Sequence, residues 1–322
     1  MEILEVDLLT YEQGATAQRR AVVDGVRRSL TTGFVYVRHD LSQSLIDEAY
    51  TQLETFFSLP QERKDAYVVP GSKGQNGYTG LLVETAAVAD VPDWKEMLNW
   101  GGPLGLGHPL RDRYPHRYGE PVLPENDLPG IADLLMAFHH SVADLQRRVL
   151  RIIAEGLGAH PSFFDEMMND SATLTRAIHY PAMDQAPDQH HVWAGEHADI
   201  NLITALPRAT AAGLQVRIGD DWVDASAPDG QAIINTGMML ERVSNGVIPS
   251  GVHRVVSAPD QTGDRYSVVQ FAHPTPWTIL TPMPSTVTDD NPLRYSSIMA
   301  SDALEKVLWD INLTETGKRL DQ

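Results

Sequence analysis

The sequence predicts an α+β protein in which a helical N-terminal half packs on one double-sheet β-barrel. Apolar residues recur at helical spacing before residue 160, whereas short β-prone runs separated by Gly, Pro, Asp and Ser follow one another after Ser171. No internal repeat or low-complexity segment separates the two halves. The 322 residues are therefore expected to bury one substantial core and to form one compact unit.

The first elements along the chain are expected to be two amphipathic helices with a short strand between them. Apolar residues recur at helical spacing from Thr16, and Gly33 ends that helix. The run GFVYVRH, which starts at this glycine, predicts a strand, and a second helix is expected after Ser42. Residues 68–125 are rich in Gly and Pro, so long loops with little regular structure are expected there.

The clearest helix is expected over 128–157, where an apolar stripe continues until Gly156 and Gly158. It predicts a rigid spine on which a sheet packs. The β-prone runs that follow are TLTRAIHY, HADINLITAL, GLQVRI, DWVDA, QAIINTG, HRVVSA and RYSVVQFA, and helical character returns after Pro292. The expected segments are an N-terminal region (1–125), the spine helix (126–160), a barrel core (170–280) and a helical tail (281–322).

The composition excludes several classes of function. With 25 Lys and Arg against 43 Asp and Glu, the chain has a formal net charge of −18 and lacks the basic surface that nucleic acids require. The absence of cysteine excludes disulfides, thiolate nucleophiles and cysteine-ligated metals. No apolar run is long enough to span a bilayer, and the first residues do not form a secretory signal. A soluble, cytoplasmic protein is expected, with no membrane, nucleic-acid or protein partner.

Three side chains are candidate metal ligands. His197 and Asp199 lie two residues apart in the β-prone run GEHADINLITAL, so both are expected to point to the same face of a strand. His253 lies on a later run, SGVHRVVSA. Two imidazoles and one carboxylate suit a divalent transition metal and leave coordination positions open. The His-x-Asp spacing alone is weak, because chance produces it in a chain of this composition and a surface pair would look the same.

A second pair of residues predicts an anion-binding site near these candidates. Arg265 and Ser267 are two apart in DRYSVVQF, so they share one face of a strand that follows His253 after one turn. A buried Arg is costly unless it holds an anion, and its planar fork matches a carboxylate. A structural salt bridge of Arg265 is the alternative. Together the two groups describe a site for a metal-chelating carboxylic acid.

Several segments occur in the same order as in one known family. They are LEVDLL, GFVYVRHDLSQSLIDEAYTQLETFFSLPQERKDAY, NGYTG, DWKEMLNWG, RAIHYPAM, GLQVRIGDDWVDASAPDGQAIINTGMMLERVSNGVIPSGVHRVVSAP and PLRYSSI. Together they resemble the isopenicillin N synthase-like family of iron(II)- and 2-oxoglutarate-dependent dioxygenases, over nearly the whole chain. The resemblance implies a double-stranded β-helix, that is a jelly-roll or cupin-like barrel, for the 170–280 core.

The resemblance also implies roles for individual residues. It makes His197, Asp199 and His253 the iron ligands, and Arg265 and Ser267 the partners of the distal carboxylate of 2-oxoglutarate. No catalytic residue beyond the metal centre is implied.

Tyr180, just before a proline, lies where the family often has a tyrosine that hydrogen-bonds the co-substrate; a packing role is the alternative. Three positions depart from the family pattern: Ile178 replaces a frequent asparagine, Met238 a common aspartate and Glu241 the usual glutamine. None of the three is a ligand position, and the effects of Ile178 and Met238 are left open.

Four residues are candidates for contacts with the substrate. Trp193 precedes the ligand strand, and Asn99 lies in a segment that often borders the pocket in this family. Met239 and Phe271 are candidates for the pocket wall, with a core position as the alternative.

The activity that the resemblance implies is oxidation of a small molecule, most simply hydroxylation of an unactivated C–H bond in specialised or antibiotic-type biosynthesis. Its cofactors would be Fe(II), 2-oxoglutarate as co-substrate, and O2, with ascorbate as a stimulant in vitro. One alternative is an iron oxidase of the same fold, a cyclase or desaturase, that does not use 2-oxoglutarate. Another is a non-catalytic 2-oxoglutarate-binding sensor. The identity of the substrate and the oligomeric state are left open.

Overall fold

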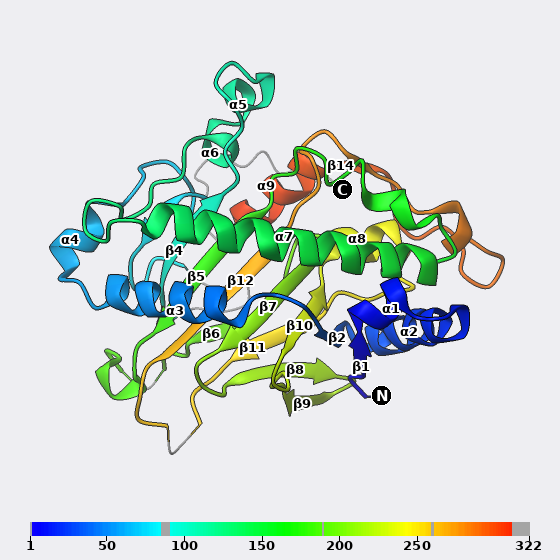
Figure 1. The fold of residues 1–322 in the computed structure, drawn as a ribbon, viewed down its shortest axis with the longest axis horizontal. Helices are drawn as coiled ribbons and strands as arrows, with labels where there is room; N and C mark the ends of the chain where they lie inside the picture. The colour runs from blue at the N-terminus through cyan, green and yellow to red at the C-terminus, as the bar shows by residue number, and fades with distance from the viewer. Residues whose placement is uncertain (1, 85–90, 189, 259–260, 311–322) are drawn as a thin grey trace.

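The computed structural model describes residues 2–84, 91–188, 190–258 and 261–310, and within them the strands form two main sheets (Figure 1). The larger sheet has eight strands in the order β1-β2-β10-β7-β12-β5-β4-β3, and the smaller has four in the order β6-β11-β8-β9. The pairs are antiparallel except β1 with β2. The α+β prediction with a jelly-roll core is confirmed.

The bounds of the larger sheet are β1 Glu5–Asp7, β2 Phe34–Arg38, β3 Gly77–Thr79, β4 Glu96–Gly101, β5 Leu174–Tyr180, β7 Ile203–Ala209, β10 Gln231–Thr236 and β12 Arg265–Ala272. Those of the smaller sheet are β6 Ala194–Ala198, β8 Leu214–Ile218, β9 Asp221–Asp224 and β11 Val252–Val255. A two-stranded sheet joins β13 (Ile279–Leu280) to β14 (Ile298–Met299). The helices are α1 Leu8–Gln13, α2 Thr16–Ser29, α3 Gln43–Phe57, α4 Gln61–Asp65, α5 Pro109–Arg113, α6 Pro115–Tyr118, α7 Ile131–Gly156, α8 Met238–Val243 and α9 Ala300–Asp310.

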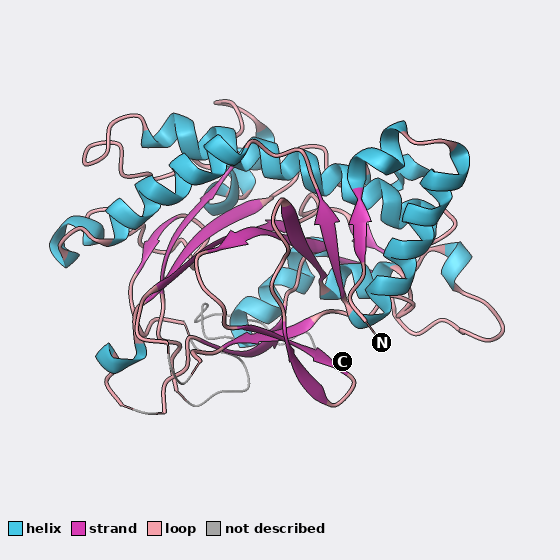
Figure 2. Ribbon diagram, turned by 60° about the horizontal axis from the view of Figure 1, so that its bottom comes forward, coloured by secondary structure: helices cyan, strands magenta, loops and turns pink. Residues whose placement is uncertain are grey.

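Helices cover one face of the larger sheet, and the smaller sheet lies on its other side (Figure 2). The spine helix expected over 128–157 is α7, whose apolar stripe is buried against the larger sheet. Gln146, fully buried on this helix, donates from Nε2 to the carbonyl oxygens of Ile203 (3.1 Å) and Gln270 (2.7 Å). These bonds connect α7 to β7 and to β12. Strand β12 carries the predicted anion-binding pair, Arg265 and Ser267.

The expectation of long loops with little regular structure over 68–125 is wrong in part. This segment contributes β3 and β4 to the larger sheet and also forms the short helices α5 and α6. Strand β4 is buried along nearly its whole length, so it shows no alternation of polar and apolar residues. Its pairing with β5, which the local sequence does not encode, makes it a strand.

The expectation that His197 and Asp199 lie on one strand is also wrong. Strand β6 ends at Ala198, and β7 begins only at Ile203. The carbonyl oxygens of Asp199 and Ile200 accept from the backbone N–H groups of Met238 (2.8 Å) and Met239 (3.0 Å), at the start of α8. The backbone at Asp199 is therefore fixed by α8 and not by a sheet partner.

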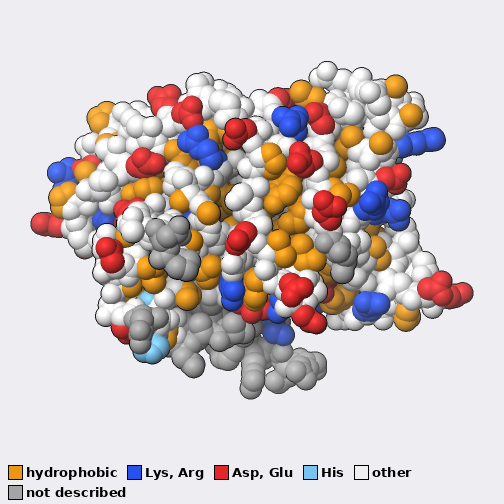
Figure 3. All heavy atoms as spheres, turned by 90° about the horizontal axis from the view of Figure 1, so that it is seen from below, with side chains coloured by type: hydrophobic (Ala, Val, Ile, Leu, Met, Phe, Trp, Pro, Cys, Tyr) orange, Lys and Arg blue, Asp and Glu red, His pale blue; other side chains and the backbone are white. Residues whose placement is uncertain are grey.

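The helical tail expected over 281–322 contains α9, and its residues 311–322 lie outside the described residues. In the described part of the chain, no helix is long and apolar enough to cross a membrane. Acidic and basic side chains are interspersed over the face in Figure 3, without a single-sign patch.

Candidate metal centre and its pocket

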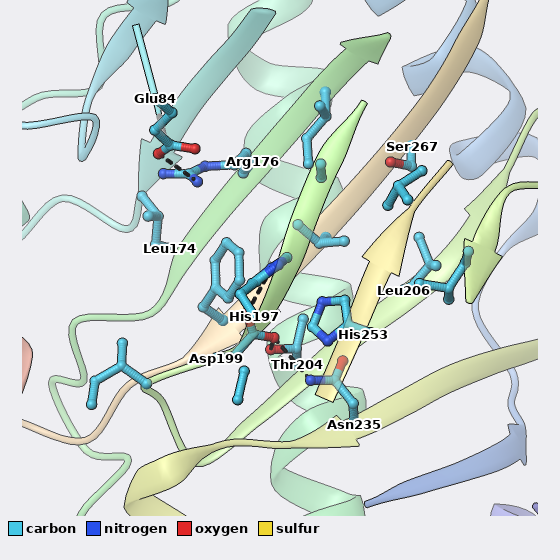
Figure 4. Close-up of a pocket in the computed structure, with 18 of the residues that line it drawn as sticks. Glu84, Leu174, Arg176, His197, Asp199, Thr204, Leu206, Asn235, His253 and Ser267 are labelled. Atoms are coloured by element: carbon cyan, nitrogen blue, oxygen red, sulfur yellow. Dashed lines mark hydrogen bonds and ion pairs between the residues drawn. The ribbon is translucent and has the colours of Figure 1, made fainter. Parts of the chain in front are cut away.

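A cavity of about 360 Å³ lies between the two sheets. Strand β12 lines it with alternate residues, which are Arg265, Ser267, Val269 and Phe271, followed by His273 just beyond the strand. Strand β5 does the same with Leu174, Arg176, Ile178 and Tyr180. The period of two means that one face of this antiparallel pair forms one wall of the cavity. The smaller sheet supplies the opposite wall (Figure 4).

The three predicted metal ligands meet on that opposite wall. One ligand atom from each of His197, Asp199 and His253 lies within 4.8 Å of the others. His197 on β6 and His253 on β11 are register partners, with ring centroids 4.3 Å apart. Asp199 joins them from the turn after β6.

Hydrogen bonds orient all three side chains toward a common point. Nδ1 of His197 lies 2.8 Å from the Gly195 carbonyl oxygen, and Nδ1 of His253 lies 3.1 Å from that of Gly251. A carbonyl oxygen only accepts, so each Nδ1 carries the proton and each Nε2 keeps a free lone pair.

The carboxylate of Asp199 is oriented in the same manner. Its Oδ2 accepts from Thr204 Oγ1 (2.6 Å) and from Asn235 Nδ2 (2.8 Å). These donors hold Oδ2 of the carboxylate in place. The other oxygen, Oδ1, lies 3.9 Å from Nε2 of His197. Thr204 and Asn235 were not predicted from the sequence. The signal that could have found them is their place on β7 and β10, which pair with each other.

The electrostatics of the three groups favour metal binding over protonation. Burial, followed by the neighbouring charge of His253, lowers the pKa of His197 to about 4, so its imidazole is neutral near pH 7. Burial opposes ionisation of Asp199, but the two imidazoles and the two hydrogen-bond donors outweigh it and hold its pKa below the usual range.

The Arg265 guanidinium is a buried cation in the same cavity. The residue is 2 % exposed, and none of the described carboxylates forms an ion pair with it. Its Nη1 lies 3.2 Å from Ser267 Oγ, and its Nε donates to the Ala211 carbonyl oxygen at 3.2 Å. The Tyr180 ring lies beside it, 5.0 Å from the guanidinium carbon to the ring centroid. A buried guanidinium without a counter-charge is a site for an anion.

Comparison with known proteins places this geometry in a family. Residues 5–126 match the model of the N-terminal region of non-haem dioxygenases in morphine synthesis, and residues 171–274 match that of the 2OG-Fe(II) oxygenase superfamily. The chain belongs to the 2-oxoglutarate–iron(II) oxygenases. It is similar to a solved 2OG-Fe(II) oxygenase family protein from Caulobacter crescentus, with 34% identity, a TM-score of 0.84, and coverage of 96% of this chain and 99% of that one.

Two further relatives of this oxygenase extend the comparison. A full-length protein from Neurospora crassa, solved in complex with alpha-KG and thymine, is 26% identical with a TM-score of 0.82, and the match covers 95% of this chain and 96% of that one. A 2-oxoglutarate-Fe(II) type oxidoreductase from Metarhizium rileyi, ppzD, is 28% identical over 87% of this chain and 82% of its own length. The family uses iron(II) and 2-oxoglutarate, and the residues of the oxygenase fit both. Two imidazoles and a carboxylate converge as donors, and the Arg265 guanidinium, which pairs with none of the described carboxylates, lines the same cavity.

A cluster of paired charges forms a further part of the oxygenase's cavity wall. Glu84 Oε1 lies 3.1 Å from Arg176 Nη1, and Glu84 Oε2 lies 2.9 Å from Lys95 Nζ (Figure 4 shows the Arg176 pair). Lys95 also contacts Asp93 Oδ2 at 2.7 Å. Sequence reasoning assigned no role to Glu84 or Arg176. The sequence signal for Arg176 is its spacing of two from Ile178 and of four from Tyr180, which places the three side chains on the same face of one strand.

Among the four predicted substrate contacts, the structure brings only Phe271 to the cavity wall. Trp193 is fully buried in a core cluster, where its Nε1 donates to the Pro181 carbonyl oxygen at 2.8 Å. Met239 is 2 % exposed in the main core. Asn99 is buried, and its Oδ1 accepts from Arg176 Nε at 2.7 Å, so it supports a wall residue from behind. The expectation that Trp193, Met239 and Asn99 line the cavity is therefore corrected: none of them is among its lining residues, because each side chain is buried in contacts with other parts of the protein.

The departures from the family pattern have defined positions. Ile178 and Met238 line the cavity, so both replacements make its surface more apolar. Glu241 accepts from the backbone N–H of Ser250 (2.8 Å) and from the Tyr295 hydroxyl (2.6 Å). Its two carboxylate oxygens therefore both have donors, and Glu241 is not among the residues that line the cavity.

Proposed function

We propose that this oxygenase binds iron(II) through His197, Asp199 and His253 and hydroxylates an unactivated C–H bond of a small molecule in specialised biosynthesis. One oxygen atom of O2 would enter the substrate C–H bond as a hydroxyl group. The other would enter 2-oxoglutarate, which is converted to succinate and CO2. The observation that carries this proposal is the convergence of the three donors in the same cavity as the unpaired guanidinium of Arg265.

Each side chain has a separate task in this proposal. Nε2 of each histidine and Oδ1 of Asp199 would hold the metal, and three protein donors would leave further coordination positions for other ligands. Arg265 and Ser267 would bind the distal carboxylate of 2-oxoglutarate, with the Tyr180 ring packed against the guanidinium. Bound iron(II), with 2-oxoglutarate and O2, supplies the oxidising chemistry.

The cavity also restricts which bonds can react. Its apolar surface, including Ile178, Leu206 and Met238, would place an apolar part of the substrate beside the ligand cluster. The Neurospora crassa relative was crystallised with thymine, which is a small ring of the size such a cavity admits. That likeness supports a small-molecule substrate.

The test is a substrate panel with iron(II) and 2-oxoglutarate, with products read by mass spectrometry and succinate measured in parallel. The expected result is a product heavier by one oxygen atom, with one succinate formed for each product molecule. Asp199→Ala should abolish product formation and metal binding together. Full activity of Asp199→Ala, or product formation without succinate, would contradict the proposal.

A further inference from the structure

The strand pair β5 and β12 has two chemically different ends. At one end Arg265 is the register partner of Tyr180, where the proposed co-substrate site lies. At the other end Phe271 is the partner of Leu174, and Val269 is the partner of Arg176. The Arg176 guanidinium carbon lies 5.5 Å from the Phe271 ring centroid, and Leu304 and Leu308 of α9 line the cavity as well. This second end therefore lies apart from Arg265 and Ser267 along the strand pair.

The ionised groups of the second end are fully paired with one another. Glu84 lies between Arg176 and Lys95, and Lys95 also contacts Asp93, so two acids balance two bases. Burial opposes ionisation of Glu84, but the charges of Arg176 and Lys95 outweigh it and lower its pKa to about 2. The fourth partner, Asp93, also accepts from the Gly195 backbone N–H at 3.0 Å. No charge of this cluster is left over for a charged ligand.

The remaining charged groups that the described residues contribute to the cavity wall are balanced too. Glu196 forms an ion pair with Arg217. With iron(II) and 2-oxoglutarate bound, the two charges of the metal offset those of the dianion, and Arg265 offsets Asp199. A carboxylate or ammonium group on the substrate would therefore enter a desolvated pocket without a counter-charge, which is strongly unfavourable.

At this end, His273 is a polar side chain whose Nδ1 has no hydrogen-bond partner among the described residues. It is 6 % exposed, it lines the cavity two residues beyond Phe271, and its Nδ1 is buried without a hydrogen bond from any described residue. A buried ring nitrogen in this state requires explanation, because leaving it unsatisfied costs free energy. Burial, and secondarily the charge of Arg117, lowers the pKa of this imidazole to about 3, so it is neutral near pH 7.

We propose that the substrate is an electrically neutral, largely apolar molecule whose carbonyl or amide group is hydrogen-bonded by His273 in the Phe271–Arg176 end of the cavity. This inference rests on the proposed function and specifies its substrate class. The two nitrogens of an imidazole point in different directions, so only one of them would meet the substrate group. That nitrogen donates to a carbonyl oxygen or accepts from an amide N–H, according to the tautomer. The paired charges of Glu84, Asp93, Lys95 and Arg176 provide a polar border with no net charge.

The test compares matched neutral and anionic probes on the metal-loaded protein under anaerobic conditions. Manganese(II) replaces iron, 2-oxoglutarate is added, and binding of both is measured first. The probe pairs are benzamide with benzoate, indole-3-acetamide with indole-3-acetate, and thymine with uracil-5-carboxylate. Binding is read from the paramagnetic relaxation of the probe protons. The neutral member of at least one pair should bind at least about tenfold more tightly than its anion.

Three variants identify the residues responsible. His273→Phe should weaken binding of the preferred neutral probe about fivefold without changing 2-oxoglutarate affinity, and His273→Gln should restore part of the loss. Glu84→Gln leaves one positive charge unpaired, so it should shift the preference toward the anion. Anion preference in the wild type, no binding of any neutral probe, or unchanged affinity in His273→Phe would overturn the inference. Failure of the protein to bind metal and 2-oxoglutarate would instead refute the proposed function.

Discussion

Thr204 provides the sharpest test of how the metal centre is held in position. Its hydroxyl donates to Asp199 Oδ2 at 2.6 Å, and the residue is 2 % exposed, so water cannot replace the bond. Thr204→Val keeps the shape of the side chain and removes the donor. The Asp199 carboxylate then retains only Asn235, at 2.8 Å, on that oxygen. A hydrogen bond to an ionised group contributes about 1.5–3 kcal/mol, so metal affinity should fall roughly 10- to 100-fold.

The assay is calorimetric titration of the metal-free protein with manganese(II), for Thr204→Val and for the matched control Thr204→Ser. The serine variant keeps the hydroxyl and should bind nearly as well as the wild type. Circular dichroism and denaturant unfolding check that both variants fold. Wild-type affinity in Thr204→Val, or an equal loss in Thr204→Ser, would show that the hydroxyl does not orient the ligand.

Three other predictions address the co-substrate, pH and the metal. Arg265→Ala should weaken 2-oxoglutarate binding by about 2 kcal/mol or more, roughly 30-fold, with manganese affinity unchanged; equal 2-oxoglutarate affinity would remove Arg265 from the site. Burial lowers the pKa of His139 from its ordinary value of 6.5 to about 4, so the folded state disfavours its protonation. The free energy of unfolding should therefore be unaffected by this histidine above pH 6.5 and should fall as the pH drops toward 4. The expected loss between pH 7 and pH 5 is about 2 kcal/mol. His139→Gln should remove this part of the pH dependence in urea unfolding, and an unaltered slope would contradict it. Manganese(II) at 100 times its dissociation constant should stabilise the wild type by about 2.7 kcal/mol, reversed by a chelator and absent in Asp199→Ala.

The sequence predicted the elements whose local pattern repeats a helical or strand period. The stripe of α7 and the alternation in β12 are properties of neighbouring residues, so they can be recognised without knowledge of the fold. Strand β4 could not be predicted in this way, because both of its faces are buried and its neighbours are rich in Gly and Pro. The residues of the substrate wall were also predicted poorly, because which side chains face the cavity depends on contacts between distant segments. Whether Met238 or Met239 faces the cavity depends on the start of α8, which the turn after β6 fixes.

The three candidate ligands and Arg265 could be proposed from the sequence, because their residue types suit a metal and an anion and because the segments that carry them resemble the family. Their convergence was decided by the tertiary structure. His197 and His253 become neighbours only through the pairing of β6 with β11, and Asp199 joins them because the backbone carbonyl of this residue and that of Ile200 accept hydrogen bonds from the start of α8. The charge balance around Glu84 and the unsatisfied Nδ1 of His273 also arise from contacts between distant segments, and interactions at such sequence separations leave no local pattern to read.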